Sequence, residues 1–349
     1  MSAVIEHQGS RQDLDLERLA SYCAPALPEF NGKVEAQRFK GGQSNPTYLV
    51  TAGDRRFVLR RKPVGTLLPS AHAVDREYRV ISALAGSDVP VAPVHLLCED
   101  DNVLGSSFYL MDYVEGRIFW DPTLPDVPVA ERAPIYGELG RVFAALHAVD
   151  PEQVGLSEFG KSGQFLERQV ARWTRQYRAS ETETIAAVDA LIDWLPAHLP
   201  SEGESRIVHG DYRLDNVIFH PTEPRILAVL DWELSTLGDP LVDFAYHCMT
   251  WRLPPSLRGL AGQPLHSLGI PDEADYRRRY LARSGRDVSD ADWTYYLVFN
   301  MFRLVGILQG IAARAINGTA SSDEAVEMGR MARPLAEDAW ALARSLQTL

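Results

Sequence analysis

The feature that most constrains the fold of this chain is the polar run HGDYRLDN at residues 209–216. A short apolar run, a turn and a second apolar run follow at 217–230, and the second run ends in Asp231. Two short apolar runs about a turn predict a β-hairpin, whose outer strand ends lie side by side. The pattern therefore predicts that Asn216 and Asp231 are neighbours, with Asp211 on the loop just ahead of them.

The oxygen-bearing side chains of this segment suit a hard cation and a proton acceptor. Asn216 and Asp231 offer two oxygen ligands, and Mg²⁺ typically takes one or two carboxylates together with substrate phosphates. Asp211, a few residues upstream, could accept a proton from a substrate hydroxyl. The alternative is a turn-rich loop that carries these carboxylates incidentally.

Hydrophobic patterning divides the chain into a β-rich first third and a mostly helical remainder. Alternation predicts strands, and apolar spacings of three and four predict helices. The first part is expected to hold a helix at 14–23, strands at 33–40, 48–52 and 56–61, a helix at 70–85 and a hairpin of 91–99 with 106–114. The later helices are expected at 130–148, 164–179, 183–198, 241–250, 273–283, 290–316 and 322–346. We therefore predict an α+β chain of two lobes, a small β-rich lobe at 1–113 and a larger helical lobe at 117–349, with a hinge at about 111–116.

Composition limits the classes of partner. Lys and Arg number 35 and Asp and Glu number 47, and the net charge of −12 argues against a nonspecific nucleic-acid coat or an anionic-membrane binder. The three cysteines form no CxxC pair, which indicates a reducing compartment. The first thirteen residues lack the apolar core of a signal peptide. The apolar stretch 295–316 contains Asn300 and Arg303, which are costly in lipid, so we expect a buried helix of a cytoplasmic protein.

The polar island resembles the catalytic apparatus of kinases. Its order is His-x-Asp, four residues, Asn, and then Asp after a short hairpin. The glycine between His209 and Asp211, and Asp-Trp-Glu at 231–233, are similar to the aminoglycoside and choline phosphotransferase superfamily. This resemblance covers about residues 30–320 and implies a protein-kinase-like fold.

Two further motifs narrow the resemblance. The run GGQSNPTY at 41–48 and the run LDWELS at 230–235, with GDP at 238–240, look most like the kinase-like domain that accompanies acyl-CoA dehydrogenases. The resemblance implies ATP and Mg²⁺ as cofactors, a small-molecule hydroxyl acceptor, and possible association with an acyl-CoA dehydrogenase as a partner.

The resemblance also assigns roles within the island. Asp211 is the implied catalytic base or hydroxyl-orienting carboxylate, and Asn216 and Asp231 are the implied magnesium ligands. His209 is expected to brace the loop. Asp243, on the helix that follows, is expected to hydrogen-bond the catalytic loop, with Asp239 as the cap of that helix.

The nucleotide phosphates are expected to contact two segments of the first lobe. The loop at 39–45 carries Gly42, whose backbone N–H could approach phosphate oxygens, and Ser44, which adds a hydroxyl. A plain hairpin turn is the alternative. This loop is neither a Walker A motif nor the GxGxxG of protein kinases.

The strand FVLR at 57–60 aligns with the Val-Ala-Ile-Lys strand of kinases. Alternation places Val58 and Arg60 on one face, where Val58 could cover the adenine and Arg60 reach the phosphates. Kinases have Lys in this place, but Arg also stays charged and can bind phosphate bidentately. Lys62 is a second candidate for the phosphate contact, and Glu77 is the expected partner of the cation.

The run FYLMDYVEG at 108–116 resembles the hinge that binds adenine, which implies Met111 and Tyr113 among the nucleotide-binding residues. Acceptor recognition is expected from the later helices, with these candidates: Trp251, Arg252, Tyr296, Arg303 and Arg314.

The resulting functional hypothesis is a small-molecule kinase that transfers the γ-phosphate of ATP to a hydroxyl of a small acceptor, with a hydroxy-acyl compound or its CoA ester as the first candidate. Two alternatives remain open at this point. One is an aminoglycoside or amino-alcohol phosphotransferase. The other is a nucleotide-binding pseudokinase module of an acyl-CoA dehydrogenase, which only the Arg at position 60 favours.

Overall fold

The computed structural model describes residues 14–39, 45–63, 73–161, 163–317 and 324–346. These fall into two compact units. The first holds the chain up to Trp120 together with Glu152–Leu156 and Arg213–Ser235, and the second holds the remainder. The sequence predicts one division of the chain, with a hinge at about 111–116. The observed units are not divided in this linear way, because the hairpin segment 213–235 packs with the first unit.

The first unit is built on an antiparallel sheet with the strand order β1-β2-β3-β5-β4. Its strands are β1 (Val34–Arg38), β2 (Thr47–Ala52), β3 (Arg55–Arg61), β4 (Val94–Cys98) and β5 (Phe108–Asp112). Its helices are α1 (Leu16–Cys23), α2 (Val74–Leu84) and α3 (Asp101–Leu104), and a separate hairpin pairs β7 (Val217–Phe219) with β8 (Ile226–Val229).

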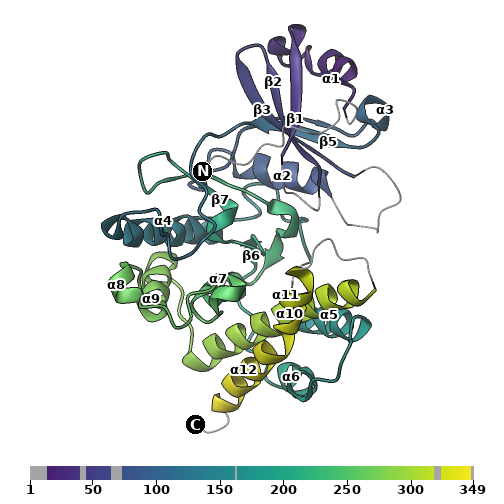
Figure 1. The fold of residues 1–349 in the computed structure, drawn as a ribbon. Helices are drawn as coiled ribbons and strands as arrows, with labels where there is room; N and C mark the ends of the chain where they lie inside the picture. The colour runs from purple at the N-terminus through teal and green to yellow at the C-terminus, as the bar shows by residue number, and fades with distance from the viewer. Residues whose placement is uncertain (1–13, 40–44, 64–72, 162, 318–323, 347–349) are drawn as a thin grey trace. The chain divides into compact units, whose positions relative to one another are not determined.

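Alternation along β3 sends its side chains to two different environments. Phe57 and Leu59 lie in a hydrophobic core with Leu19 and Cys23 of α1. Residues on the other face of β3 include Arg60, whose side chain reaches α2. The two helices thus cover opposite faces of the sheet, as Figure 1 shows. Because both faces of β3 are covered, large side chains occur on each of them.

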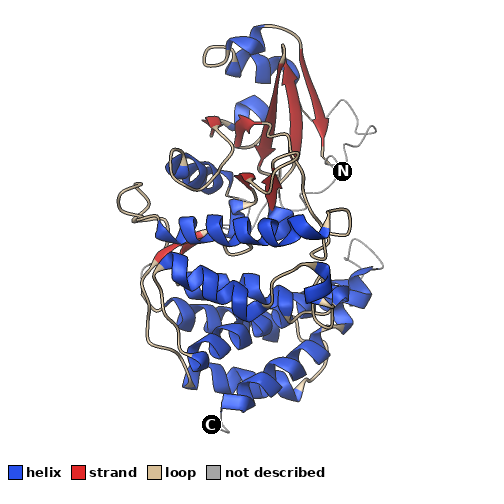
Figure 2. Cartoon of the chain, turned by 90° about the vertical axis from the view of Figure 1, so that its left-hand side faces the viewer, coloured by secondary structure: helices blue, strands red, loops and turns tan. Residues whose placement is uncertain are grey.

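The second unit is mostly helical (Figure 2). Its helices are α4 (Val129–Ala148), α5 (Phe165–Ala179), α6 (Ala186–Ala197), α7 (Pro240–Cys248), α8 (Leu265–Leu268), α9 (Glu273–Ser284), α10 (Asp290–Ile316), α11 (Glu324–Arg330) and α12 (Ala332–Ser345). A two-stranded antiparallel sheet pairs β6 (Arg206–Val208) with β9 (Thr236–Gly238). α10 is central, because α5, α7, α11 and α12 all pack against it.

Short polar side chains begin several helices of this unit. Each accepts a hydrogen bond from a backbone N–H of the first turn, which satisfies a donor that the helix leaves unpaired. These caps are Asp239 for α7, Asp272 for α9 and Ser289 for α10. The sequence expectation of a capping role for Asp239 is confirmed, with its Oδ1 accepting from Leu241 N at 2.8 Å.

The helix expected at 322–346 is interrupted. α11 ends at Arg330 and α12 begins at Ala332. Pro334 explains the break, because proline has no N–H to donate to the carbonyl of Arg330 and its ring crowds that carbonyl. α10, by contrast, has the bounds expected for it. By length and composition α10 could cross a membrane, but 61% of its most apolar window is buried inside the protein.

Candidate active site

A buried ionic cluster forms where β3 and β5 face α2 in the first unit. Arg60 and Tyr109 are direct cross-strand partners, so their side chains project to the same face of the sheet. Glu77 of α2 meets both of them: its Oε2 lies 3.2 Å from Arg60 Nε and accepts from the Tyr109 hydroxyl at 3.0 Å. Its Oε1 accepts from Asn45 Nδ2 at 2.8 Å. The predicted pairing of Arg60 with Glu77 is present in the structure.

The charges of Arg60 and Glu77 are largely shielded from solvent. The side chains of Arg60 and Glu77 are 12% and 1% exposed, and the Arg60 Nε–H does not point along the line to Glu77, so this contact is an ion pair without a hydrogen bond. Burial opposes the charge of Arg60, but Tyr109, Glu77 and Asp231 hold its pKa above the ordinary value. Burial raises the pKa of Glu77, and the Arg60 guanidinium and the donated Tyr109 hydrogen bond oppose that shift. Arg60 is therefore a fixed positive charge.

Asp231 extends this cluster toward the β7–β8 hairpin. Its Oδ1 lies 3.4 Å from Arg60 Nη2, and its side chain is 37% exposed, far more than that of Glu77. The backbone of Asp231 is left-handed, with φ at 63°. Asp and Asn tolerate this conformation better than most residues. The turn that follows is held by buried Trp232, whose Nε1 donates to Val229 O at 3.0 Å.

The hairpin brings Asn216 and Asp231 together through its backbone. Val217 pairs with Val229, and the next contact outward is Leu230 N donating to Asn216 O at 2.8 Å. Asp231 follows Leu230 directly, so the two predicted metal ligands stand at the same open end of the hairpin. Within the described residues, no cluster of three or more His, Cys, Asp or Glu side chains could hold a metal ion.

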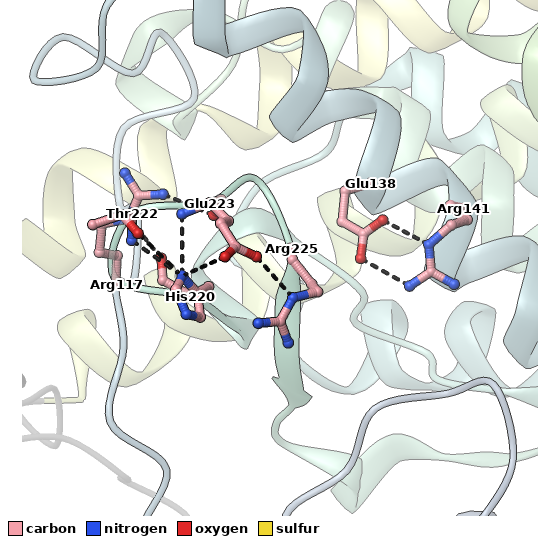
Figure 3. Close-up of polar contacts among 7 residues, drawn as sticks. All are labelled: Arg117, Glu138, Arg141, His220, Thr222, Glu223 and Arg225. Atoms are coloured by element: carbon pink, nitrogen blue, oxygen red, sulfur yellow. Dashed lines mark hydrogen bonds and ion pairs between the residues drawn. The ribbon is translucent and has the colours of Figure 1, made fainter.

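The closed end of the hairpin is fixed by Arg117 (Figure 3). Its Nε donates to His220 O and its Nη2 donates to Glu223 O, both at 2.9 Å. His220 Nδ1 in turn accepts from Thr222 N and Glu223 N at 3.3 and 3.2 Å. Clamping this turn restrains the register of the two strands, and hence the open end where Asn216 and Asp231 lie.

The loop that carries Asp211 belongs to the second unit, and Asp243 of α7 binds its backbone. Asp243 Oδ2 accepts from His209 N at 2.6 Å, and its Oδ1 accepts from Gly210 N at 2.9 Å. This is the contact expected for Asp243. His209 is fully buried, and its Nδ1 accepts from Asp211 N at 3.2 Å, which fits the expected bracing role.

A buried histidine supports Asp243 from α4. His147 Nε2 lies 3.3 Å from Asp243 Oδ2, and its Nδ1 lies 2.6 Å from the Tyr280 hydroxyl. Since a carboxylate only accepts, Nε2 carries the proton toward Asp243. Burial opposes the charge of Asp243, but His147 and the donated backbone N–H of His209 hold its pKa below the ordinary value. The loop is therefore anchored to a stable negative charge.

Two residues bind this loop through contacts that the sequence did not predict. The Tyr246 hydroxyl donates to Asp211 Oδ1 at 2.6 Å, and Arg303 Nη2 donates to Gly210 O at 2.8 Å. Arg303 had been expected only as one of five acceptor-binding candidates. A usable signal existed for Tyr246, which lies three residues after Asp243 and so on the same face of α7.

The other four acceptor candidates have structural partners. Trp251 is buried and its Nε1 donates to Pro271 O at 2.8 Å. Arg252 pairs with Glu273 at 2.9 Å, and the Tyr296 hydroxyl lies 3.5 Å from Asp239 Oδ2. Arg314 lies in the last turn of α10. Of the five, the structure places Arg303 against the loop of Asp211.

The remaining residues predicted to bind the nucleotide lie in different surroundings. Gly42 and Ser44 lie outside the described residues. Met111 is a cross-strand partner of Val58, and both are mostly buried, so they form one apolar surface. The Tyr113 ring lies under the Arg56 guanidinium, 4.5 Å from its centroid. Lys62 follows the end of β3, and the ionic cluster with Glu77 and Asp231 forms around Arg60 instead.

A cavity of about 200 Å³ lies within the second unit. It is lined by the start of α5, by the segment 199–205 and by Gly238 and Asp239. Asp239 is already engaged as the cap of α7. The chemistry of the site is therefore defined by the side-chain contacts above and not by this cavity.

Comparisons with known proteins show the family of this chain. The chain is 48% identical over 312 residues to acyl-CoA dehydrogenase family member 10 of Mus musculus, covering 88% of this chain and 29% of that protein. It is 40% identical over 343 residues to acyl-CoA dehydrogenase family member 11 of the same organism, covering 96% of this chain and 44% of that protein. The chain thus spans less than half of the length of these curated relatives.

Solved structures share the fold. A crystal structure from Ralstonia eutropha, provisionally named an aminoglycoside phosphotransferase, is 51% identical with a TM-score of 0.88, covering 95% of this chain and 98% of that one. An aminoglycoside phosphotransferase in ternary complex with AMP-PNP and hygromycin B has 16% identity and a TM-score of 0.62, covering 93% of this chain and 98% of that one, and shows the fold alone. The family model described as the phosphotransferase enzyme family matches residues 35–288, and the chain belongs to that family.

Proposed function

We propose that this protein is a kinase that uses ATP and Mg²⁺ to phosphorylate a hydroxyl of a small acceptor, a hydroxy-acyl compound or its CoA ester. The observation that carries the proposal is the ionic cluster of Arg60, Glu77 and Asp231, which supplies one fixed cation beside one partly exposed carboxylate. Membership of the phosphotransferase family supports a small-molecule kinase.

Nucleotide binding is proposed on the first unit. Arg60 is buried, charged and held by Glu77, so its guanidinium is oriented before a ligand arrives. A preoriented cation can neutralise phosphate charge with little reorganisation, which is how charged groups contribute most to phosphoryl transfer. The adjacent apolar surface of Val58 and Met111 suits one face of an adenine ring. A structure of the same fold holds AMP-PNP, and by analogy we propose ATP as the nucleotide.

The donor set at the open end of the hairpin fits magnesium. Asp231 contributes a carboxylate that is partly exposed, and Asn216 contributes a neutral oxygen at the neighbouring strand end. Two oxygen ligands are too few for a self-contained metal cage, but Mg²⁺ usually completes its coordination with water and substrate phosphates. When bound there, the metal would supply charge neutralisation at the phosphates.

Asp211 is the proposed catalytic base. It accepts the proton of the acceptor hydroxyl as the acceptor oxygen forms a bond to the γ-phosphorus and the bond from that phosphorus to the β-bridging oxygen breaks. ADP leaves with the bridging oxygen, and the proton passes from Asp211 to solvent. The backbone just before Asp211 is anchored, because Asp243 binds His209 N and Gly210 N.

The acceptor class rests on relatives. The 48% identical relative is named an acyl-CoA dehydrogenase family member, which supports a hydroxy-acyl acceptor and an acyl-CoA dehydrogenase as a functional partner. An aminoglycoside or amino alcohol is the second candidate, supported by the provisional name of the 51% identical structure. A net charge of −12 also suits a cationic acceptor, although global charge is weak evidence for one site.

A pseudokinase module is the less supported alternative. Its basis was the Arg at position 60, and the structure pairs this Arg with Glu77 in the manner expected of the kinase lysine. A protein that only docks would not need Asp211 and Asp231. Transfer of phosphate to any acceptor would exclude it.

The decisive experiment is an assay of ATP consumption over four acceptors: 3-hydroxybutyrate, 3-hydroxybutyryl-CoA, choline and hygromycin B. We expect Mg²⁺-dependent turnover with one of the first two. Asp211→Asn should lower kcat by about 10²–10⁴, the usual contribution of a general base, with the affinity for AMP-PNP nearly unchanged. Asp189→Asn, an exposed carboxylate of α6 that pairs with Arg178, is the matched control and should retain full turnover.

A further inference from the structure

Asp243 and Tyr246 of α7 both bind the loop of Asp211, and only Asp243 has an assigned role. Asp243 binds the backbone of His209 and Gly210. Tyr246, three residues later on the same helix face, binds the side chain of Asp211 itself, with its hydroxyl 2.6 Å from Oδ1. This distance is in the range of short, charge-assisted O–H···O⁻ bonds, which are stronger and more directional than neutral ones.

Arg303 of α10 completes this arrangement. Its Nη2 donates to Gly210 O at 2.8 Å, and its guanidinium lies 4.6 Å from the centroid of the Tyr246 ring. The same guanidinium lies 5.5 Å from the centroid of the Trp173 ring. A guanidinium over an aromatic face is attracted by the ring, so Arg303 restrains Tyr246 while it binds the loop.

Both backbone polar groups of Gly210 are therefore hydrogen-bonded to side chains. Its N–H donates to Asp243 and its carbonyl accepts from Arg303. Its φ of 83° lies in the left-handed region that favours glycine, so the loop bends sharply one residue before Asp211. The bend does not by itself fix the direction of the Asp211 side chain. The hydrogen bond from Tyr246 supplies that restraint.

We infer that Tyr246 and Arg303 are positioning residues for Asp211. Tyr246 holds one carboxylate oxygen of Asp211 and so fixes the side-chain rotamer in which the carboxylate receives the acceptor hydroxyl. Arg303 fixes Tyr246 and the preceding carbonyl together. This inference rests on the proposed function, because it assigns a role relative to Asp211 as the base. Placement of a base within hydrogen-bond reach determines how often the acceptor is in a reactive geometry.

The test compares two isosteric substitutions in the wild-type chain. Tyr246→Phe removes the hydroxyl that binds Asp211 and keeps the ring under Arg303. Tyr295→Phe is the control: Tyr295 is buried while Tyr246 is partly buried, and the Tyr295 hydroxyl donates to Leu195 O at 3.0 Å and not to the loop. Each substitution removes one tyrosine hydroxyl that donates a hydrogen bond. Phosphorylation is followed with the acceptor from the four-compound panel on which the wild type turns over fastest.

We expect Tyr246→Phe to lower kcat by roughly ten- to hundred-fold, the effect of losing one hydrogen bond to a charged group, with the KM for ATP within about two-fold of wild type. Tyr295→Phe should keep the wild-type kcat. In an Asp211→Asn background, Tyr246→Phe should cause no further loss of the residual rate, since the pair acts as one unit. Arg303→Lys, which keeps the charge but not the planar stacking, should lower kcat less than Tyr246→Phe.

Three results would overturn the inference. An unchanged or higher kcat in Tyr246→Phe, with an active wild type, overturns it and leaves the proposed function standing. An equal loss in the Asp211→Asn background also overturns it, because the hydroxyl would then act independently of Asp211. If the wild type consumes no ATP with any of the four acceptors, the proposed function and this inference fail together.

Discussion

Arg60 and Glu77 form a buried ion pair, with Arg60 Nε 3.2 Å from Glu77 Oε2. Kinases place a lysine and a glutamate in the corresponding positions. The longer, forked guanidinium allows Arg60 to reach Asp231 Oδ1 at 3.4 Å as well, so a single cation bridges the helix α2 and the open end of the β7–β8 hairpin. A lysine ammonium is a single point charge and has no second arm for this bridge.

The first prediction concerns this cation. Arg60→Lys should raise the KM for ATP and retain part of kcat, because the charge beside Glu77 remains while the contact to Asp231 is lost. Arg60→Ala should be far more damaging: it leaves Glu77 buried and unpaired, which costs about 3–5 kcal/mol of folding stability. Steady-state kinetics over a range of ATP concentrations, with thermal unfolding of each variant, measures both effects.

The control for this prediction is on the same strand. Arg56 lies on the same face of β3, is exposed, and pairs with Glu115 at 2.7 Å. Arg56→Lys should leave the KM for ATP unchanged, and Lys62→Ala should change it much less than Arg60→Lys. If Lys62→Ala has the larger effect, Lys62 and not Arg60 is the phosphate contact.

The second prediction concerns the metal. Asp231→Asn should abolish the Mg²⁺-dependent part of AMP-PNP binding, because the only carboxylate proposed to bind the metal loses its charge. Asparagine is chosen since the φ of 63° at this position disfavours alanine, whose Cβ would add strain of about 1–2 kcal/mol. Asn216→Ala should weaken binding less, as a neutral amide contributes less charge. Calorimetry with and without Mg²⁺ separates the metal from the nucleotide, and Mg²⁺-dependent affinity equal to wild type in Asp231→Asn would remove the assignment.

The sequence pattern predicted those features of the site that depend on one strand, hairpin or helix alone. The hairpin followed from two apolar runs about a turn, and its backbone pairing of Asn216 with Leu230 follows from antiparallel register. Strand alternation placed Arg60 on the face of β3 that α2 covers. The bounds of α10 followed from its apolar spacing, and the structure adds the Ser289 cap that begins the helix.

Contacts between distant segments could not be predicted in the same way. Asn45 and Tyr109 both bind Glu77, but they lie 32 residues from it on either side. Arg303 binds the carbonyl of Gly210, which is 93 residues away. Such contacts depend on how helices pack, and hydrophobic spacing within one helix does not determine which neighbour it meets. Tyr246 is intermediate, because its helix face was predictable and its partner was not.

The third prediction concerns the bend in the loop of Asp211. Gly210→Ala should lower kcat at least ten-fold, because a Cβ at φ 83° strains the backbone by about 1–2 kcal/mol and the loop can relieve it by moving Asp211. Gly285→Ala is the control: its φ is 63°, nothing lies within 4 Å of an added Cβ, and it follows the end of α9. It should show a similar loss of stability with wild-type kcat. Equal kinetic losses in both variants would mean that strain alone, wherever it lies, impairs turnover.

The last prediction concerns acid sensitivity and rests on His247 of α7. This residue is buried: Nδ1 lies 3.0 Å from Tyr212 O and Nε2 lies 2.9 Å from the Tyr276 hydroxyl. Since a carbonyl only accepts, Nδ1 carries the proton of the neutral ring and Nε2 accepts from Tyr276. Burial lowers the pKa of His247 to about 4. The folded protein therefore resists a proton that the unfolded chain takes up near the ordinary histidine pKa of about 6.5.

The sign of the effect follows from this difference. Stability from the neutral ring is complete above about pH 6.5 and is lost as pH falls toward about 4, by roughly 3 kcal/mol over the whole range. Urea unfolding at pH 7.5 and pH 5 should show a fall in the wild type that is about 2 kcal/mol larger than in His247→Gln. Burial also lowers the pKa of His147, so the variant should keep part of the slope. Exposed His266→Gln is the control and should follow the wild type, and an identical pH dependence in wild type and His247→Gln would show that His247 is not held neutral by the fold.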